Sequence, residues 1–288
     1  MQPSHVDVLG HGMAYRRAGS GRDVLFLHGN PTSSLLWADV VADLSDAYCC
    51  TALDLIGMGD SDRLPGTGDE RYGFGEHARY LDAAVRALGL DRDVVLVGHD
   101  WGGVLAVDWA RRHPGAVRGL AYLEAGVVPV SWREGTGPDP GLFGALRGPD
   151  GERMVLQENL FVEVVLQAGT QRTLTAAELD AYRRPFAVPG EDRRAMLTWA
   201  RQIPIDGNPP EVHDRVAAGA EFLAASPLPK LLVSGEPGAV VTGAVLEACR
   251  RWPRQREVVV PGTHFLPHDA SPAIAAALRA WLEEEVTV

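Results

Sequence analysis

The chain has few cysteines and no long apolar run. Its 288 residues include three cysteines, Cys49, Cys50 and Cys249, without the Cys-x-x-Cys spacing of redox or zinc motifs. This set offers no disulfide framework, so we expect a protein of the reducing cytoplasm. No apolar run reaches the roughly 18 residues that a membrane span requires. Residues 1–10 also lack the basic and then apolar pattern of a signal peptide.

Positive charge is scarce as well. The chain has 27 Lys and Arg against 38 Asp and Glu, a net charge of -11 at pH 7. A nucleic-acid backbone would repel such a chain, so we expect no nucleic-acid partner. Hydrophobic residues make up 46% and charged residues 23% of the chain, as in ordinary globular proteins. A chain of this length can bury a sizeable hydrophobic core without disulfide bonds or a structural metal. We expect a monomer or a small homo-oligomer.

Short apolar strands alternate with helical patterns along most of the chain. The expected strands are Val24–Leu27, Ala47–Leu53, Val94–Val97, Gly119–Leu123, Lys230–Ser234 and Glu257–Val260. The expected helices of this part are Glu76–Leu88, Gly102–His113, Gly243–Arg251 and Pro272–Glu285. His5–Leu9 and Met13–Arg17 are candidates for antiparallel edge strands. The alternation predicts an α/β fold with a mainly parallel sheet and helices on both faces.

The alternation breaks between residues 127 and 210. This stretch is rich in Pro, Gly and Arg, and it has no convincing strand. Its helical patterns are Leu156–Gln167, Ala176–Arg183 and Asp192–Arg201. We interpret residues 127–210 as a helical cap inserted into a core made of residues 1–126 and 211–288.

One motif combines a strand, a sharp turn and a helix. The apolar strand 94–97 leads into a Gly-His-Asp-Trp-Gly turn at residues 98–102, and a helical pattern follows. This is the layout of a nucleophile elbow, which forces its central side chain out to the top of the sheet. The central residue is usually serine, but here it is Asp100. A carboxylate can attack saturated carbon and form an ester, so the motif predicts covalent catalysis through an alkyl ester.

Two more reactive groups follow strands. Glu124 comes directly after the strand 119–123, and His264 follows the last strand. Because the carboxyl ends of parallel strands meet at one edge, Asp100, Glu124 and His264 can converge as nucleophile, orienting acid and base. A second acid, Glu236, follows the strand 230–234. Strand-end geometry alone leaves Glu124 and Glu236 as equal candidates for the partner of the histidine.

Neutral hydrogen-bond donors accompany the elbow. Asn30 follows the first core strand, and its backbone N–H and that of Trp101 are candidate oxyanion-hole donors. The side-chain N–H groups of Asn30 and Trp101 would face a group displaced by Asp100. Such donors suit a weakly hydrated halide, whereas a phosphate would require Arg, Lys or a glycine-rich loop. Asn30 before Pro31 is also a common turn pair, which is its structural alternative.

The chain resembles the haloalkane dehalogenases from about residue 29 to residue 269, and this resemblance implies the α/β-hydrolase fold. The resemblance includes cap motifs that epoxide hydrolases, which share the elbow, do not have. The matching motifs are residues 28–34 (HGNPTSS), 54–62 (DLIGMGDSD), 98–102 (GHDWG), 182–186 (YRRPF), 201–207 (RQIPIDG) and 262–265 (GTHF).

The resemblance implies roles by position. Asp100 would be the nucleophile, His264 the base, and Asn30 with Trp101 the pair that stabilises the halide. The subfamily with Asn at the halide site takes its acid after the strand that ends at Leu123, which favours Glu124 over Glu236. The resemblance also implies a pocket or tunnel lined by Phe143, Phe161, Val165, Pro204, Val240, Phe265 and Leu266. Gly169 and Val240 stand where relatives carry bulkier aliphatic residues, which suggests a wider tunnel mouth.

The implied activity converts a small haloalkane and water into an alcohol, a halide ion and a proton, without a cofactor or a metal. His264 and His268 have the spacing of a helical zinc pair, but Pro267 between them argues against that site. One alternative is an epoxide hydrolase, which would use two cap tyrosines, whereas residues 127–210 contain only Tyr182. The other is a non-catalytic ligand-binding homologue, which would lack a member of the triad.

Overall fold

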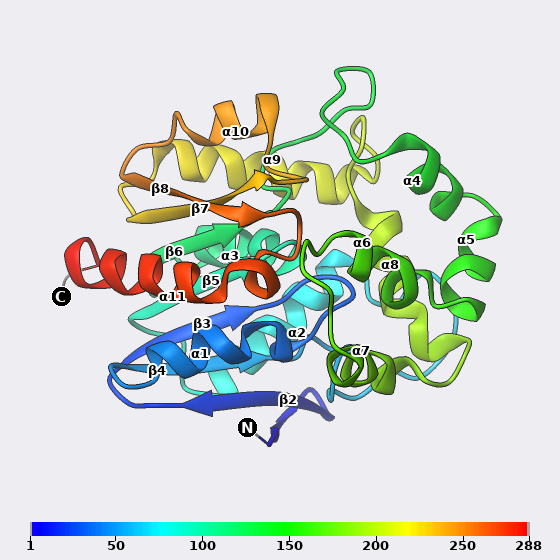
Figure 1. The fold of residues 1–288 in the computed structure, drawn as a ribbon, viewed down its shortest axis with the longest axis horizontal. Coiled ribbons are helices and arrows are strands. Elements are labelled where there is room, and N and C mark those ends of the chain that lie inside the picture. Colours follow the sequence, from blue (N-terminus) through cyan, green and yellow to red (C-terminus); the bar gives the residue numbers. More distant parts are fainter. Residues whose placement is uncertain (1, 287–288) are drawn as a thin grey trace.

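The structure, a computed structural model that describes residues 2–286, is built around one sheet of eight strands. The strand order is β1-β2-β4-β3-β5-β6-β7-β8, and only the pairs β1–β2 and β2–β4 are antiparallel. The strands are Ser4–Val8 (β1), His11–Ala18 (β2), Arg22–Leu27 (β3), Tyr48–Leu53 (β4), Val94–His99 (β5), Val117–Leu123 (β6), Lys230–Pro237 (β7) and Gln255–Gly262 (β8). The expected α/β fold is confirmed, including the two antiparallel edge strands (Figure 1).

The central strands are apolar on both faces because helices cover both faces. In β3, Val24 and Phe26 pack into the hydrophobic cluster on one face of the sheet, and Leu25 and Leu27 pack into the cluster on the other. Successive side chains of a strand point to opposite faces, so a strand buried on both sides reads as a continuous apolar run.

The two helical layers differ in size. On one face, α1 (Ala38–Leu44) packs against α11 (Leu266–Glu284), with the short η1 (Ser34–Trp37) beside them. The other face carries α2 (Phe74–Ala87), α3 (Trp101–Arg112), α9 (Pro210–Ala225) and α10 (Gly243–Cys249). No helix within residues 2–286 combines the length and the apolar character that crossing a bilayer demands.

Short helices connect β6 to α9. Figure 1 shows α4 to α8 grouped beyond the tips of the parallel strands, at the edge where Asp100, Glu124 and His264 follow their strands. These helices are α4 (Pro140–Arg147), α5 (Asp150–Glu152), η2 (Arg153–Gln157), η3 (Phe161–Val165), α6 (Leu166–Ala168), α7 (Ala176–Arg183), η4 (Arg184–Phe186), η5 (Glu191–Arg193) and α8 (Arg194–Gln202).

Several helices differ from the expectations, and α1 and α4 are among those that were not expected. The helical pattern 156–167 is interrupted at Asn159, whose left-handed backbone (φ 55°) separates the π-helical turns η2 and η3. The helix α9 was not expected, although its buried residues Val212, Val216 and Leu223 recur at helical spacing. The last helix begins at Leu266 rather than at Pro272, because a kink at Ala270 joins a short first turn to the main helix.

Candidate active site

Asp100 occupies the turn between β5 and α3. Its backbone adopts φ 50° and ψ -125°, a conformation that side-chain-bearing residues seldom occupy. A Cβ atom on Gly98 would lie 2.5 Å from the backbone oxygen of Gly102, and one on Gly103 would lie 2.5 Å from the Cβ of Ala125. Both positions therefore require glycine, as a nucleophile elbow does.

Two backbone N–H groups point at the Asp100 carboxylate. The N–H of Asn30 donates to Oδ2 of Asp100 over 2.9 Å, and the N–H of Trp101 also bonds to this carboxylate. Burial raises the pKa of Asp100 above its ordinary value, while the positive charge on His264 and the two N–H groups oppose this effect. The same two N–H groups lie where they can stabilise an oxyanion that forms at the carboxyl carbon of Asp100.

The loop that carries Asn30 is fixed by His28. The Nδ1–H of His28 donates to the carbonyl of Gly29 (2.9 Å), and its Nε2 accepts from the N–H of Leu55 (3.0 Å). This pattern requires a neutral imidazole, and burial lowers the pKa of His28. Both ring nitrogens of His28 are thus occupied in holding the Gly29–Asn30 turn over Asp100.

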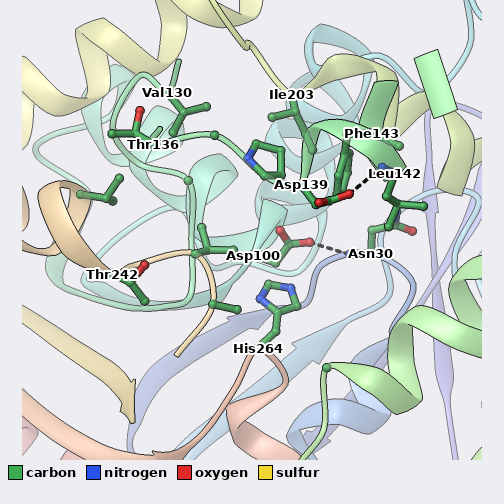
Figure 2. A pocket seen from close by; sticks show the side chains of 18 of the residues that line it. Asn30, Asp100, Val130, Thr136, Asp139, Leu142, Phe143, Ile203, Thr242 and His264 are labelled. Carbon is green, nitrogen blue, oxygen red and sulfur yellow. Dashed lines mark hydrogen bonds between the residues drawn. The ribbon is translucent and has the colours of Figure 1, made fainter. Parts of the chain in front are cut away.

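The side chains of Asn30 and Trp101 line the same cavity as Asp100. One N–H of the Asn30 amide donates to the carbonyl of Met196 over 3.1 Å, which leaves the second N–H available. Figure 2 shows Asp100 and His264 near each other at the cavity, and a dashed line marks the hydrogen bond from the backbone N–H of Asn30 to Asp100.

Glu124, and not Glu236, lies beside His264. The Nδ1 of His264 is 3.6 Å from Oε2 of Glu124, whose side chain is fully buried. The Glu124 carboxylate also accepts bonds from the backbone N–H groups of Ala239 (2.9 Å), Val240 (2.7 Å) and Val241 (3.4 Å). Glu236 is exposed at the end of β7. Of the two acids that follow expected strands, Glu124 is therefore the one whose carboxylate lies next to the His264 ring.

The ring of His264 faces two acids. Burial alone would lower the pKa of His264, but Glu124 and Asp100 together raise it above the ordinary histidine value. The backbone of the histidine is also fixed, because the Nε2–H of His99 donates to the carbonyl of His264 over 2.8 Å.

Gly169, at the end of α6, contacts the histidine loop. Its carbonyl accepts bonds from the hydroxyl of Thr263 (2.7 Å) and from the N–H groups of His264 (3.1 Å) and Phe265 (2.9 Å). A Cβ atom on Gly169 would lie only 2.8 Å from the ring of Phe265. The Phe265 ring therefore fills part of the space that a larger residue at position 169 would occupy.

The cavity has a volume of about 740 Å³ and a largely apolar lining. Phe143, Phe161, Val165, Pro204, Val240 and Phe265 line it, as expected. Leu266 is different: its fully buried side chain packs against Gly235 and Gly262, toward the sheet and away from the cavity.

Other lining residues were not expected from the sequence. They include residues 134–139, Val104, Ile203 and Thr242. The segment 134–139 is an irregular loop, and its two acids, Glu134 and Asp139, are exposed at the cavity wall. The motif 201–207, which contains the expected pocket residue Pro204, could have pointed to Ile203, whereas no sequence signal marks the loop.

Comparisons with known proteins agree with this geometry. A family model described as the alpha/beta hydrolase fold matches residues 24–271. A haloalkane dehalogenase of Sphingobium indicum is 47% identical over 277 residues, which cover 96% of this chain and 94% of that protein. A haloalkane dehalogenase of Mycolicibacterium smegmatis is 42% identical, over 96% of this chain and 90% of that protein.

Solved structures give the same result. The crystal structure of the haloalkane dehalogenase DbeA from Bradyrhizobium elkani superposes with a TM-score of 0.91 at 39% identity, covering 98% of this chain and 97% of that one. That of DatA, a haloalkane dehalogenase from Agrobacterium tumefaciens, superposes with a TM-score of 0.91 at 32% identity, covering 99% and 97%. The resemblance of the motifs is thereby confirmed, and the chain belongs to the haloalkane dehalogenase family of the α/β-hydrolase fold.

Proposed function

We propose that this haloalkane dehalogenase breaks the carbon–halogen bond through a covalent ester on Asp100. The observation that carries the proposal is the convergence of Asp100, Asn30, Trp101 and His264 on one apolar cavity of about 740 Å³. A cavity of this size and character accommodates a small neutral alkyl halide. The substrates and products would be a haloalkane, water, an alcohol and a halide ion.

In the first step, an oxygen of Asp100 attacks the carbon that bears the halogen. A carbon–oxygen bond forms while the carbon–halogen bond breaks, and the halide leaves with the electron pair of the broken bond. The indole N–H of Trp101 and the free amide N–H of Asn30 stabilise the charge that develops on the halogen.

In the second step, His264 takes a proton from a water molecule. The water oxygen attacks the carbonyl carbon of the Asp100 ester, and the oxyanion that forms is held by the N–H groups of Asn30 and Trp101. The alcohol then leaves and the carboxylate is restored. Glu124 stabilises the protonated histidine and orients its ring.

Loss of the Asn30 amide should slow halide release. We expect Asn30→Ala to lower kcat by about 10²–10³-fold, by analogy with the loss of one oxyanion-hole donor. Asn208→Ala is the matched control, since Asn208 also precedes a proline but is exposed and outside the cavity. Equal rates for the two variants would contradict the role of Asn30.

Loss of the Glu124 charge should change both the rate and its pH dependence. Glu124 raises the pKa of His264, and the base must be neutral, so activity falls as the pH drops through that pKa. In Glu124→Gln the pKa of His264 falls, and the acid limb of the kcat profile should move to lower pH. The maximal rate should drop by about 10²-fold or more.

Glu236→Gln is the control for this experiment, because Glu236 is exposed and lies outside the cavity lining. Its pH profile should match that of the unmodified enzyme. A profile that moves in Glu236→Gln and stays in place in Glu124→Gln would reverse the assignment of the acid.

The function is tested by halide release. We expect the purified protein to release bromide from short bromoalkanes such as 1,2-dibromoethane without an added metal or cofactor. A folded protein that releases no halide from a panel of chloro-, bromo- and iodoalkanes would contradict the proposed function.

The epoxide hydrolase alternative is not favoured. It would need cap hydroxyls that protonate the opening epoxide, and Tyr182 is the only tyrosine in residues 127–210, all of which the structure describes. Its hydroxyl lies 2.9 Å from Nε2 of His268, and Tyr182 does not line the cavity. The presence of all three triad side chains in contact with one another or with the cavity also disfavours a non-catalytic binding protein.

We further propose that residues 127–210 act as the cap of this enzyme, with residues 1–126 and 211–288 as its core. The support is that helices from this segment, rather than loops of the sheet alone, carry Phe143, Phe161 and Val165 into the cavity lining. All three cysteines are free thiols, which agrees with a reducing cytoplasm as the proposed location.

A further inference from the structure

Trp101 belongs to a stack of three flat rings. The ring centre of Trp199, from α8, lies 4.4 Å from the ring centre of Trp101, and the two ring planes form an angle of 24°. The imidazole of His77, from α2, covers Trp199 in turn, at 4.1 Å and 19°. Trp199 is fully buried and does not line the cavity, and the cavity residue on which its ring stacks is Trp101. The stack joins a helix between β6 and β7 to two helices of the sheet layer.

The helix α8 contacts both halide donors. Trp199 packs on Trp101, and the carbonyl of Met196, three residues earlier, accepts the bond from the Asn30 amide. The helix is itself held in place by Arg194, whose buried side chain forms ion pairs with Asp69 (2.9 Å), Glu152 (3.1 Å) and, at 2.5 Å, Glu191. A change in the position of α8 would therefore reach both donors together.

His77 contributes a surface and no hydrogen bond. It is 1% exposed, and neither ring nitrogen has a hydrogen-bond partner among the residues that the structure describes. Burial lowers the pKa of His77 to about 3, which favours the neutral ring at neutral pH. The interaction of His77 with Trp199 is therefore the stacking of its imidazole ring on the indole.

The direction of an indole N–H is fixed by the plane of its ring. A tilt of the Trp101 ring would move its N–H away from the halogen without removing the side chain. Chloride, a smaller ion than bromide, concentrates its charge more and depends more strongly on aligned donors. A misaligned Trp101 should thus slow the cleavage of a carbon–chlorine bond more than that of a carbon–bromine bond.

We propose that Trp199 and His77 are positioning residues that hold the indole of Trp101 in the plane at which its N–H meets the departing halide. The proposal rests on the proposed function, because it assigns the stack to the halide site of that reaction. Trp199 and His77 touch no reacting atom. They act through the orientation of Trp101.

The experiment compares flat and non-flat replacements. Trp199→Leu and His77→Leu remove a ring from the stack, whereas Trp199→Phe and His77→Phe retain one. The control is Trp281→Leu, since Trp281 is as fully buried as Trp199 but lies in α11, against Gly119 and on the opposite face of the sheet. The measurements are kcat for n-butyl chloride and n-butyl bromide, and the inhibition constant of free bromide.

In the two Leu variants of the stack we expect the chloride-to-bromide rate ratio to fall by about tenfold or more, within the range that a misplaced group can cause. Bromide should inhibit them more weakly. The Phe variants should recover most of both properties, and Trp281→Leu should keep the ratio of the unmodified enzyme. If one Leu variant does not fold, the other Leu variant still tests the proposal. The Phe variants, compared with Trp281→Leu, test it as well.

Unchanged ratios and unchanged bromide inhibition in folded variants of the stack would overturn the proposal while the unmodified enzyme still releases halide. Failure of the unmodified enzyme itself to release halide would instead overturn the proposed function. A ratio that shifts equally in Trp281→Leu would also overturn the proposal, because the effect would then follow from a general loss of packing.

Discussion

Asp100→Ala should abolish turnover, with kcat lowered by at least about 10⁴-fold, as expected when a nucleophile is removed. No other carboxylate can replace it. Glu124 is held by the backbone N–H groups of residues 239–241, and Glu134 and Asp139 are exposed in the loop at the cavity wall. The measurement is halide release under saturating haloalkane. Retention of more than a few per cent of the activity would contradict the role of Asp100.

The same variant should remain folded and no less stable. The pKa of Asp100 is raised in the folded state, chiefly by burial, so the ionised carboxylate opposes folding at neutral pH, well above the unfolded pKa. The strained backbone at this residue (φ 50°) is the same for aspartate and alanine, so the prediction rests on the removal of the buried carboxylate. We therefore expect the thermal midpoint of Asp100→Ala to equal or exceed that of the unmodified protein. A thermal midpoint far below that of the unmodified protein would contradict our account of the elbow.

His264→Phe should stop the reaction after its first step. Formation of the ester needs no base, so one halide should leave per enzyme molecule, and the alkyl group should then remain on the protein. We expect a rapid burst of halide near the enzyme concentration, followed by a rate lowered by about 10⁴-fold or more. Mass spectrometry should find the alkyl group on the peptide that contains Asp100.

His113→Phe is the control for this trap. His113 follows α3, is half-buried and lies outside the cavity lining, so this variant should turn over normally and carry no adduct. An adduct on another residue of His264→Phe would reassign the nucleophile. Steady turnover without a burst would show that His264 is not the base.

The sequence predicted the sheet and the residues that follow its strands. Strands buried on both faces are apolar throughout, and the glycines around Asp100 mark a turn that tolerates no larger side chain, so both leave a local signal. Glu124 and Glu236 each follow one of the strands expected from the sequence and were equivalent on that basis. What distinguishes the two acids is the loop 239–241, whose backbone N–H groups bind Glu124. No local sequence pattern predicts this loop.

Contacts between distant segments were the part that the sequence did not predict. The wrong assignment of Leu266 to the pocket arose because it follows Phe265, which does line the cavity, yet the first turn of α11 directs Leu266 into the cluster beneath β7 and β8. The bond from Asn30 to Met196 and the stack of Trp101 on Trp199 join segments more than ninety residues apart. Residues that act through another side chain carry no motif of their own.

The central claim is that the oxygen of the alcohol comes from Asp100 and that water attacks the ester. A single turnover of the unmodified enzyme in ¹⁸O-labelled water tests it most directly, with enzyme in excess over n-butyl bromide. We predict an alcohol without the label and a labelled carboxylate in the peptide that contains Asp100. A labelled alcohol from the first turnover, with an unlabelled Asp100, would contradict the account, since water would then have displaced the halide directly.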